Sequence, residues 1–256
     1  MFAKERQNKI YDMIKSNGAV TTSELVKIFN VSIETIRRDL LYMEKTEQLL
    51  RVHGGAVARG EMKPYLNLDQ RNKEFGKQKR NLAIKAMEFI SEGDIIGIDS
   101  GSTAIVFAEV LKDRFSNLTA VTHSLDVFNI LSGHFPVILC GGHYLQEENA
   151  FYGPLTLQML KSICMQKVFI FPSAVSFEHG ICDYQKELFQ IQKQLINSSE
   201  NVFCLADSSK FEKRAFLKVG DMKTDYSYIS DSGLPEKLIK LYRKNNIKIY
   251  MGEGKV

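Results

Sequence analysis

Apolar residues recur at helical spacing in three short stretches near the start of the chain. A first helix is predicted within roughly the first sixteen residues, a second from Thr21 or Thr22 to Asn30, and a third behind Ser32, because Thr and Ser side chains cap helix N-termini. The apolar residues predicted to face inward are Ile10, Met13 and Ile14, then Leu25, Val26 and Phe29, then Ile33, Ile36, Leu40 and Met43. A short extended piece at Ala19-Val20 separates the first two helices. The pattern predicts a small three-helix domain.

From Arg80 onward, apolar runs of strand length alternate with helical stretches. The predicted strands are 95–98, 118–122, 137–140, 168–171, 202–205, 228–230 and 247–250, and the predicted helices are 82–90, 105–111, 155–163, 188–196 and one around Leu238. Strands that alternate with helices favour a mostly parallel sheet covered on both faces. The larger part of the chain is therefore expected to be an α/β domain.

The two patterns are separated by a segment that is richer in charged and polar residues, between about residues 58 and 79. Gly60, Pro64 and Gly76 interrupt any long helix there. We expect an N-terminal domain at 1–57, a linker at 58–77 and an α/β domain at 78–256. A chain of 256 residues with 44% hydrophobic and 25% charged residues has the size and balance of such soluble domains.

The third predicted helix carries a polar face that suits a DNA duplex. Thr35, Arg37 and Arg38 lie off its apolar stripe, so its N-terminal turn is predicted to enter the major groove. The following Arg-Val-His-Gly-Gly-Ala at 51–56 has the basic residues and the glycine pair of a wing that approaches DNA closely. The alternative is a helical domain with a solvated charged face, but the three-helix spacing and the basic tail together favour DNA binding. The residues expected to contact DNA are Thr22, Ser32, Thr35, Arg37, Arg38, Arg51, His53, Gly54 and Gly55.

Charge and cysteine content narrow the class of protein further. The net charge is +4, and residues 1–60 hold ten Lys or Arg against seven Asp or Glu, so the positive excess lies where DNA is expected. No apolar run reaches membrane-spanning length and no signal-peptide core follows Met1, so a cytoplasmic protein is expected. Cys140, Cys164, Cys182 and Cys204 lack the spacing of a zinc site, so we expect reduced thiols, no metal and no cofactor.

Polar motifs follow several of the predicted strands. Asp99-Ser100-Gly101-Ser102-Thr103 opens a helix, so its amides and hydroxyls suit a phosphate at the helix N-terminus. Thr122-His123, Gly141-Gly142 and Asp207 to Lys210 also follow strands, and ligands gather at the carboxyl ends of parallel strands. Alone, the first loop would be read as a turn with a helix cap. Together the four motifs predict a site for a phosphorylated, hydroxyl-bearing ligand.

Several of these motifs closely resemble the DeoR family of bacterial transcription regulators. The resemblance rests on Thr35-Ile36-Arg37-Arg38-Asp39-Leu40, on Arg51 to Ala56, on the strand-end motifs, and on Leu205 to Phe211. It implies a winged helix-turn-helix followed by a sugar-phosphate sensor domain. By the same resemblance Arg71 and Lys79 match positions where the family carries an arginine and a Glu-Lys pair, with Gln78 in place of the glutamate. The residues expected at the effector are Arg71, Lys79, Asp99, Ser100, Gly101, Ser102, Thr103, Thr122, His123, Gly141, Gly142, Asp207 and Lys210.

An enzyme is the rival class, because the family's sensor domain resembles sugar-phosphate isomerases of the ribose-5-phosphate isomerase kind. Such an isomerase needs a positioned general base, for which Asp99 and Asp207 are candidates. Both have ordinary alternatives: Asp99 braces its loop, and Asp207 accepts a hydroxyl or pairs with Lys210. Because a winged helix has no use in a simple isomerase, no catalytic residue is expected.

The chain departs from the family pattern at a few positions. His123 stands where asparagine is usual, Phe171 to Val175 replaces a glycine-containing stretch, and Leu188 replaces one of two usual glutamates. These changes predict an unusual effector or weak binding. Glu47 stands where a turn glycine is common, a change that the wing is expected to tolerate.

The sequence therefore predicts a repressor of carbohydrate-metabolism genes that a phosphorylated sugar or sugar derivative releases from operator DNA. A homodimer or homotetramer is expected, because one recognition helix reads too few base pairs for useful specificity. A sugar-phosphate isomerase-like enzyme with an added DNA-binding domain is the alternative.

Overall fold

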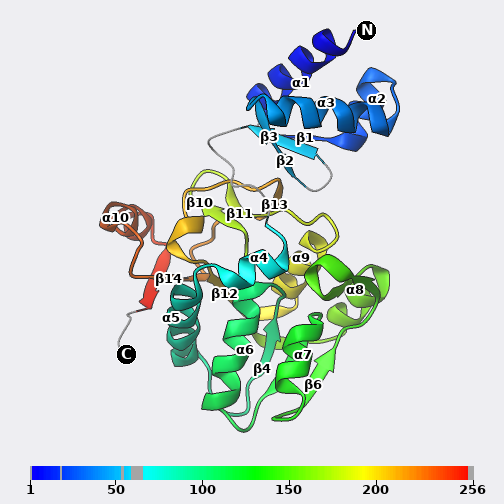
Figure 1. Ribbon diagram of the computed structural model, residues 1–256. Helices are drawn as coiled ribbons and strands as arrows, with labels where there is room; N and C mark the ends of the chain where they lie inside the picture. Colours follow the sequence, from blue (N-terminus) through cyan, green and yellow to red (C-terminus); the bar gives the residue numbers. More distant parts are fainter. Residues whose placement is uncertain (1, 18, 53–54, 59–65, 253–256) are drawn as a thin grey trace. The chain divides into compact units, whose positions relative to one another are not determined.

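The computed structural model describes residues 2–17, 19–52, 55–58 and 66–252. The chain divides into two compact units, one formed by the N-terminal 65 residues together with Lys213–Phe216, and one formed by Leu66–Glu212 and the chain from Leu217 onward. Figure 1 labels the helices and strands of both units. No helix in the described ranges combines the length and the apolar composition that a membrane span needs.

The first unit contains three helices and a small antiparallel sheet. Its elements are α1 (Ala3–Asn17), β1 (Ala19–Thr21), α2 (Thr22–Phe29), α3 (Ile33–Lys45), β2 (Leu49–Val52) and β3 (Gly55–Ala58). The sheet has the order β1-β3-β2, so β3 pairs with both other strands. The three predicted helices and the extended piece at Ala19-Val20 are confirmed.

Local geometry explains where these elements begin and end. Thr21 caps α2 in a capping box with Glu24, and Asn30 ends that helix in the left-handed region, at φ 50°. Ser32 caps α3 as predicted. Glu47 has a φ of 59°, which accounts for a glycine being common at this position.

One residue of the predicted apolar stripe is misplaced. Ile33 is 50% exposed, whereas Ile36, Leu40 and Met43 are buried in the core of the first unit. Ile33 is the first residue of α3, beyond the part of the helix that packs on its neighbours, so helical periodicity overestimates the length of the buried face. The prediction that Ile33 is buried was wrong.

The second unit is built on a seven-stranded sheet of order β15-β14-β12-β9-β4-β5-β6, in which every neighbouring pair is parallel. The strands are β4 (Ile95–Ile98), β5 (Thr119–Thr122), β6 (Val137–Leu139), β9 (Met165–Ile170), β12 (Ser199–Leu205), β14 (Ser227–Asp231) and β15 (Lys248–Gly252). All seven predicted strands are confirmed, and with them the α/β class with a mostly parallel sheet.

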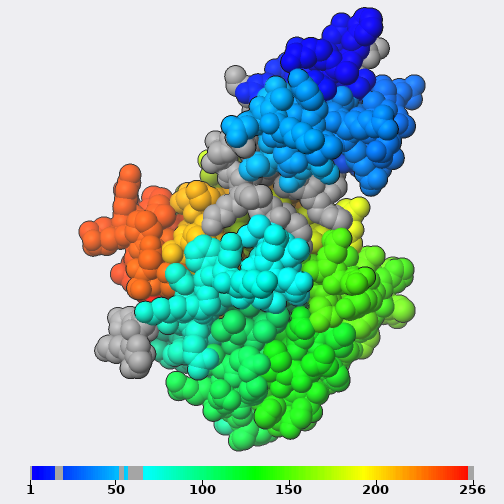
Figure 2. Space-filling view, in the orientation of Figure 1, coloured from blue at the N-terminus to red at the C-terminus, as the bar shows by residue number. Residues whose placement is uncertain are grey.

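Helices cover both faces of this sheet. The helices are α5 (Gly76–Ala86), η1 (Met87–Phe89), α6 (Ser102–Arg114), α7 (Leu125–Leu131), α8 (Pro154–Lys161), α9 (Phe189–Asn197) and α10 (Glu236–Lys244). Leu82 of α5, Phe107 of α6 and Val127 of α7 belong to one core cluster. Leu160 of α8 and Ile191 of α9 belong to another, so α5 to α7 and α8 to α10 lie on opposite faces. Figure 2 shows the surface over α6 and α7 in green.

Several elements were not predicted. They are the helix α4 (Leu68–Lys73), the short helices η2 (Gln146–Glu148) and η3 (Ser208–Lys210), the hairpin of β7 (His143–Leu145) and β8 (Ala150–Tyr152), and a sheet of β10 (Ala174–Ser176), β11 (Gly180–Asp183) and β13 (Leu217–Gly220). Helix α7 was also missed. Helix α4 lies inside the segment predicted as a linker, where Asn67 and Gln70 form a capping box and Leu68 is buried.

Candidate functional site

The N-terminal turn of α3 presents hydroxyl and guanidinium groups on the surface of the first unit. The Ser32 hydroxyl accepts a hydrogen bond from the Thr35 amide at 3.2 Å, and the two hydroxyls lie 2.9 Å apart. Arg37 and Arg38 are exposed, and a guanidinium nitrogen of Arg37 lies 3.9 Å from an exposed Glu34 carboxylate. An exposed ion pair of this length is weak, so the Arg37 side chain can reorient toward a phosphate or a base.

A buried ion pair fixes the back of the same helix. Arg6 of α1 donates from Nε to Asp39 of α3, and Gln7 Nε2 donates to the other Asp39 oxygen at 3.0 Å. All three side chains are buried. Sequence reasoning missed this role of Asp39, although an acidic residue next to Arg38 on the inward face of an amphipathic helix was a signal.

The other residues expected at DNA differ in how exposed they are. Thr22 is the first residue of α2 and is half-buried, and Arg51 is exposed on β2, where its amide donates to Glu44 at 3.0 Å. A Cβ on Gly55 would lie 2.1 Å from the Val20 carbonyl oxygen, so Gly55 lets β3 approach β1. His53 and Gly54 lie outside the described residues.

In the second unit, the N-terminus of α6 lies behind the end of β4. Gly101 precedes the helix with a φ of 107°, and no side chain caps the helix. Thr103 is 1% exposed, and among the described residues its hydroxyl has no hydrogen-bond partner. Ser100 and Ser102 are buried beside it. Uncapped amides with a buried, unpartnered hydroxyl are a suitable receptor for an anion.

Three cationic side chains lie near this helix end. Arg71 comes from α4, and its Nη1 would lie 3.4 Å from a Cβ on Gly101. Lys79 is 3% exposed and donates to the carbonyls of Arg71 and Glu74, the latter at 2.7 Å. Burial, together with the nearby charge of Lys210, lowers the pKa of Lys79 to about 8. Asp207 and Glu74 oppose this shift, so Lys79 lies among charges of both signs.

Lys210 contacts the segment from Phe171 to Val175, which departs from the family pattern. Its Nζ donates to the Pro172 carbonyl at 2.9 Å, and burial lowers its pKa while Asp207 opposes that shift. Asp207 caps η3 by accepting from the Ser209 amide at 3.1 Å. Lys210 and Asp207 therefore lie together as the sequence predicted, with the Asp207 carboxylate already engaged in its own turn.

Asp99 and His123 form a fully buried pair, both 0% exposed. The ring Nε2 of His123 lies 3.0 Å from Asp99 Oδ1, and Nδ1 lies 2.9 Å from the Phe151 carbonyl oxygen. Gln192 donates to the second Asp99 oxygen at 2.9 Å. Because both ring nitrogens already face acceptors, His123 braces Asp99 and β8 in this structure and has no ring nitrogen left for a ligand.

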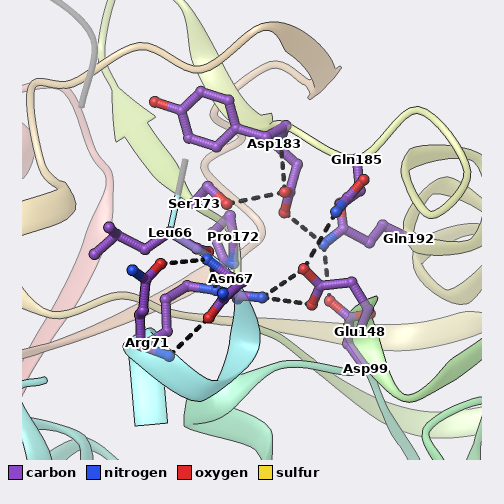
Figure 3. Close-up of polar contacts among 12 residues, drawn as sticks. Leu66, Asn67, Arg71, Asp99, Glu148, Pro172, Ser173, Asp183, Gln185 and Gln192 are labelled. Carbon is purple, nitrogen blue, oxygen red and sulfur yellow. Dashed lines mark hydrogen bonds and ion pairs between the residues drawn. The ribbon is translucent and has the colours of Figure 1, made fainter. Parts of the chain in front are cut away.

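A second group of side chains, which the sequence did not indicate, adjoins Asp99 (Figure 3). Gln192 Nε2 bridges Asp99 and Asp183, with 3.0 Å to Asp183, and Ser173 also donates to Asp183 at 2.9 Å. Glu148 accepts from Arg71 and, at 3.3 Å, from Gln185. Glu148, Asp183 and Gln192 come from η2, β11 and α9, and Ser173 and Gln185 come from the loops before β10 and after β11, so only the fold brings them together.

The two remaining strand-end motifs make internal contacts. Thr122 Oγ1 accepts from the Ser124 amide at 3.1 Å. A Cβ on Gly142 would lie 2.2 Å from Thr156 Oγ1, which in turn donates to the Gly141 carbonyl at 3.0 Å. Gly142 therefore permits close packing of β7 against α8, and Gly141 has open space for a Cβ.

Comparisons with known proteins match both units. The model of the DeoR-like helix-turn-helix domain matches residues 6–61, and the model of the DeoR C terminal sensor domain matches residues 74–232. The chain is 35% identical to the lactose phosphotransferase system repressor of Lactococcus lactis, over 83% of this chain and 85% of that protein. It is 30% identical to the L-fucose operon activator of Haemophilus influenzae, over 94% and 97%. Among solved structures, ribose 5 phosphate isomerase A from Neisseria gonorrhoeae matches 53% of each chain, with 25% identity and a TM-score of 0.41.

Proposed function

The chain belongs to the DeoR family of transcription regulators, and on that premise we propose that it represses genes of carbohydrate metabolism until a phosphorylated sugar releases it from its operator. The observation that carries the proposal is the uncapped N-terminus of α6, with the buried Thr103 hydroxyl and with Arg71 beside it. The charges of Lys79 and Lys210 lie close enough to Arg71 to interact with it. Helix-end amides, a hydroxyl and buried cations are the groups that bind a phosphate dianion.

The sugar part of the effector is proposed to meet the polar groups that surround the phosphate site. Asp207, Asp183, Gln185 and Gln192 supply carboxylate and amide groups, and the Gln192 Oε1 atom is buried without a hydrogen-bond partner in the described structure. Carboxylates and amides hydrogen-bond sugar hydroxyls. The two relatives act on a lactose phosphotransferase system and an L-fucose operon, which supports a sugar-related effector without identifying it.

On the DNA side, α3 is proposed to lie in the major groove with Ser32, Thr35, Arg37 and Arg38 toward the duplex. Ile33 joins this face because it is exposed beside them, and an aliphatic side chain there can contact a thymine methyl group. Thr22, Arg51, His53 and Gly54 are proposed as flanking contacts. A homodimer or homotetramer supplies the second recognition helix that a paired half-site requires.

An isomerase activity is less well supported. A general base needs a carboxylate within reach of the substrate proton. Asp99 is fully buried and accepts from His123 and Gln192, while Asp207 accepts from the backbone of its own turn. Both carboxylates therefore have structural partners, in keeping with a sensor that binds without turnover.

Thr103→Val tests the proposed phosphate site. Because the Thr103 hydroxyl has no partner to lose, the variant should fold with unchanged or higher stability, yet it should bind a sugar phosphate about five- to tenfold more weakly. The measurement is release of the full-length protein from promoter DNA by a panel of sugar phosphates, followed by fluorescence anisotropy. Thr119→Val, on the adjacent strand β5, is the control. Release of Thr103→Val at the wild-type ligand concentration would place the phosphate elsewhere.

A further inference from the structure

Glu148 is a buried carboxylate that lies beside the proposed phosphate site and has no role in it so far. It ends the short helix η2 and is 3% exposed. Both its oxygens accept from Nη2 of Arg71 at 2.5 Å, and Gln185 donates to Oε1 at 3.3 Å (Figure 3). A charge-assisted contact of this kind neutralises the guanidinium that the phosphate site would otherwise use.

The same guanidinium also borders the N-terminus of α6. Its Nη1 nitrogen would lie 3.4 Å from a Cβ on Gly101, the residue that precedes the helix. Arg71 is therefore placed between two positions for negative charge, the Glu148 carboxylate and the uncapped helix end. A phosphate at the helix end must share this cation with Glu148 and must also tolerate its negative charge.

Arg71 also organises its own segment. Its Nε donates to the Leu66 carbonyl at 2.9 Å, and its carbonyl accepts from Lys79. Helix α4 is thus attached to the rest of the second unit through the Arg71–Glu148 ion pair. A ligand that draws the Arg71 guanidinium away from Glu148 breaks this ion pair and forms its own contact with Arg71 instead.

We propose that Glu148 is an internal anion that competes with the effector's phosphate for Arg71, and so sets the affinity of the sensor. The inference rests on the proposed phosphate site. With Glu148 in place, binding must first displace or share an existing ion pair, which raises the apparent dissociation constant. A chain without this carboxylate would respond at lower ligand concentrations.

The test is Glu148→Gln in the full-length protein, with inorganic phosphate as the probe and isothermal titration calorimetry as the measurement. The variant should bind phosphate about fivefold more tightly, because a like charge is removed and Arg71 is released. Glu147→Gln removes one charge from the adjacent exposed residue and should leave the affinity unchanged. In an Arg71→Ala background the gain from Glu148→Gln should largely disappear, because a double-mutant cycle isolates the coupling between the two residues.

Hydrogen exchange of the wild-type protein provides a second measurement that does not depend on how the variants fold. Saturating phosphate should slow exchange in the first turn of α6 and accelerate it at 146–149, where Glu148 loses its partner. Two results together would overturn this inference alone: Glu148→Gln binds phosphate with the affinity of the wild type, and phosphate does not change hydrogen exchange at 146–149 in the wild type. Absence of phosphate binding by the wild type and every variant would overturn the proposed site as well.

Discussion

Lys79 is the residue of the proposed effector site whose titration can be followed. Its pKa is lowered to about 8, mainly by burial and also by the charges of Lys210 and Arg71, while Asp207 and Glu74 oppose the shift. Near pH 8 the Lys79 amine of the ligand-free protein is therefore partly neutral. A bound phosphate favours the ammonium form and raises this pKa, so binding takes up a proton, and affinity should fall by up to about tenfold per pH unit above pH 8.

The measurement is the dissociation constant of a hexose 6-phosphate between pH 7 and 9.5, where a phosphate ester is already fully ionised. Lys79→Met should bind weakly and with a flatter pH profile. Lys77→Met, one exposed charge removed on the same helix, should retain the wild-type slope. If the profiles of Lys79→Met and the wild type are parallel, Lys79 does not carry the proton.

Among single residues, the sequence indicated the cations of the proposed site and Asp207, but not Glu148, the anionic partner of Arg71. Arg71, Lys79 and Lys210 were named from motifs and resemblance, and the structure places them near one another. Glu148 and Gln192 follow no strand-end rule, because they belong to η2 and to the middle of α9. His123 was expected as a ligand contact, but its neighbours Asp99 and Phe151 could be identified only in three dimensions.

Among the elements, the position of α3 depends on one buried ion pair. Asp39→Ala removes the buried carboxylate that accepts from Arg6 and Gln7, so the first unit should lose about 3–5 kcal/mol of unfolding free energy. DNA binding should fail at the temperature where this unit melts. Chemical denaturation of the full-length protein, followed by circular dichroism, measures the loss.

Glu34→Ala is the matched control, because it removes an exposed ion pair on the same helix, with a nitrogen–oxygen distance of 3.9 Å. Its effect should stay within about 0.5 kcal/mol. An Asp39→Ala variant as stable as Glu34→Ala would mean that Arg6 finds another acceptor or becomes hydrated, and that α1 does not fix the recognition helix through this contact.

The elements that the sequence predicted are those with long or strongly apolar patterns. All strands of the seven-stranded sheet were found because each contains a short run rich in apolar residues, as in the buried stretch Ile96 to Ile98 of β4. The hairpin of β7 and β8 and the strands β10, β11 and β13 were missed, since they are short and most of them contain a polar residue or a glycine that interrupts the apolar run. Helix α4 was missed because only Leu68 of its six residues is buried, which leaves no apolar period.

For the whole molecule, the division into two units predicts that the two activities can be lost separately. Gly55→Val would place a side chain where a Cβ already lies 2.1 Å from the Val20 carbonyl oxygen, so β3 could not pair with β1. The first unit should be destabilised and DNA binding should be lost. Phosphate binding by the second unit should remain within about twofold of the wild type, because Gly55 and the proposed phosphate site belong to different compact units.

Gly133→Val is the control, since no atom lies within 4 Å of its Cβ position and the residue is in the second unit. Scanning calorimetry and phosphate titration of both variants, with the full-length chain, give the result. If Gly55→Val lowers one transition temperature and leaves phosphate binding unchanged, the two units fold independently of one another. If Gly55→Val also abolishes phosphate binding, residues 1–57 stabilise the sensor domain. Release from DNA would then involve a change in the folding of the whole chain.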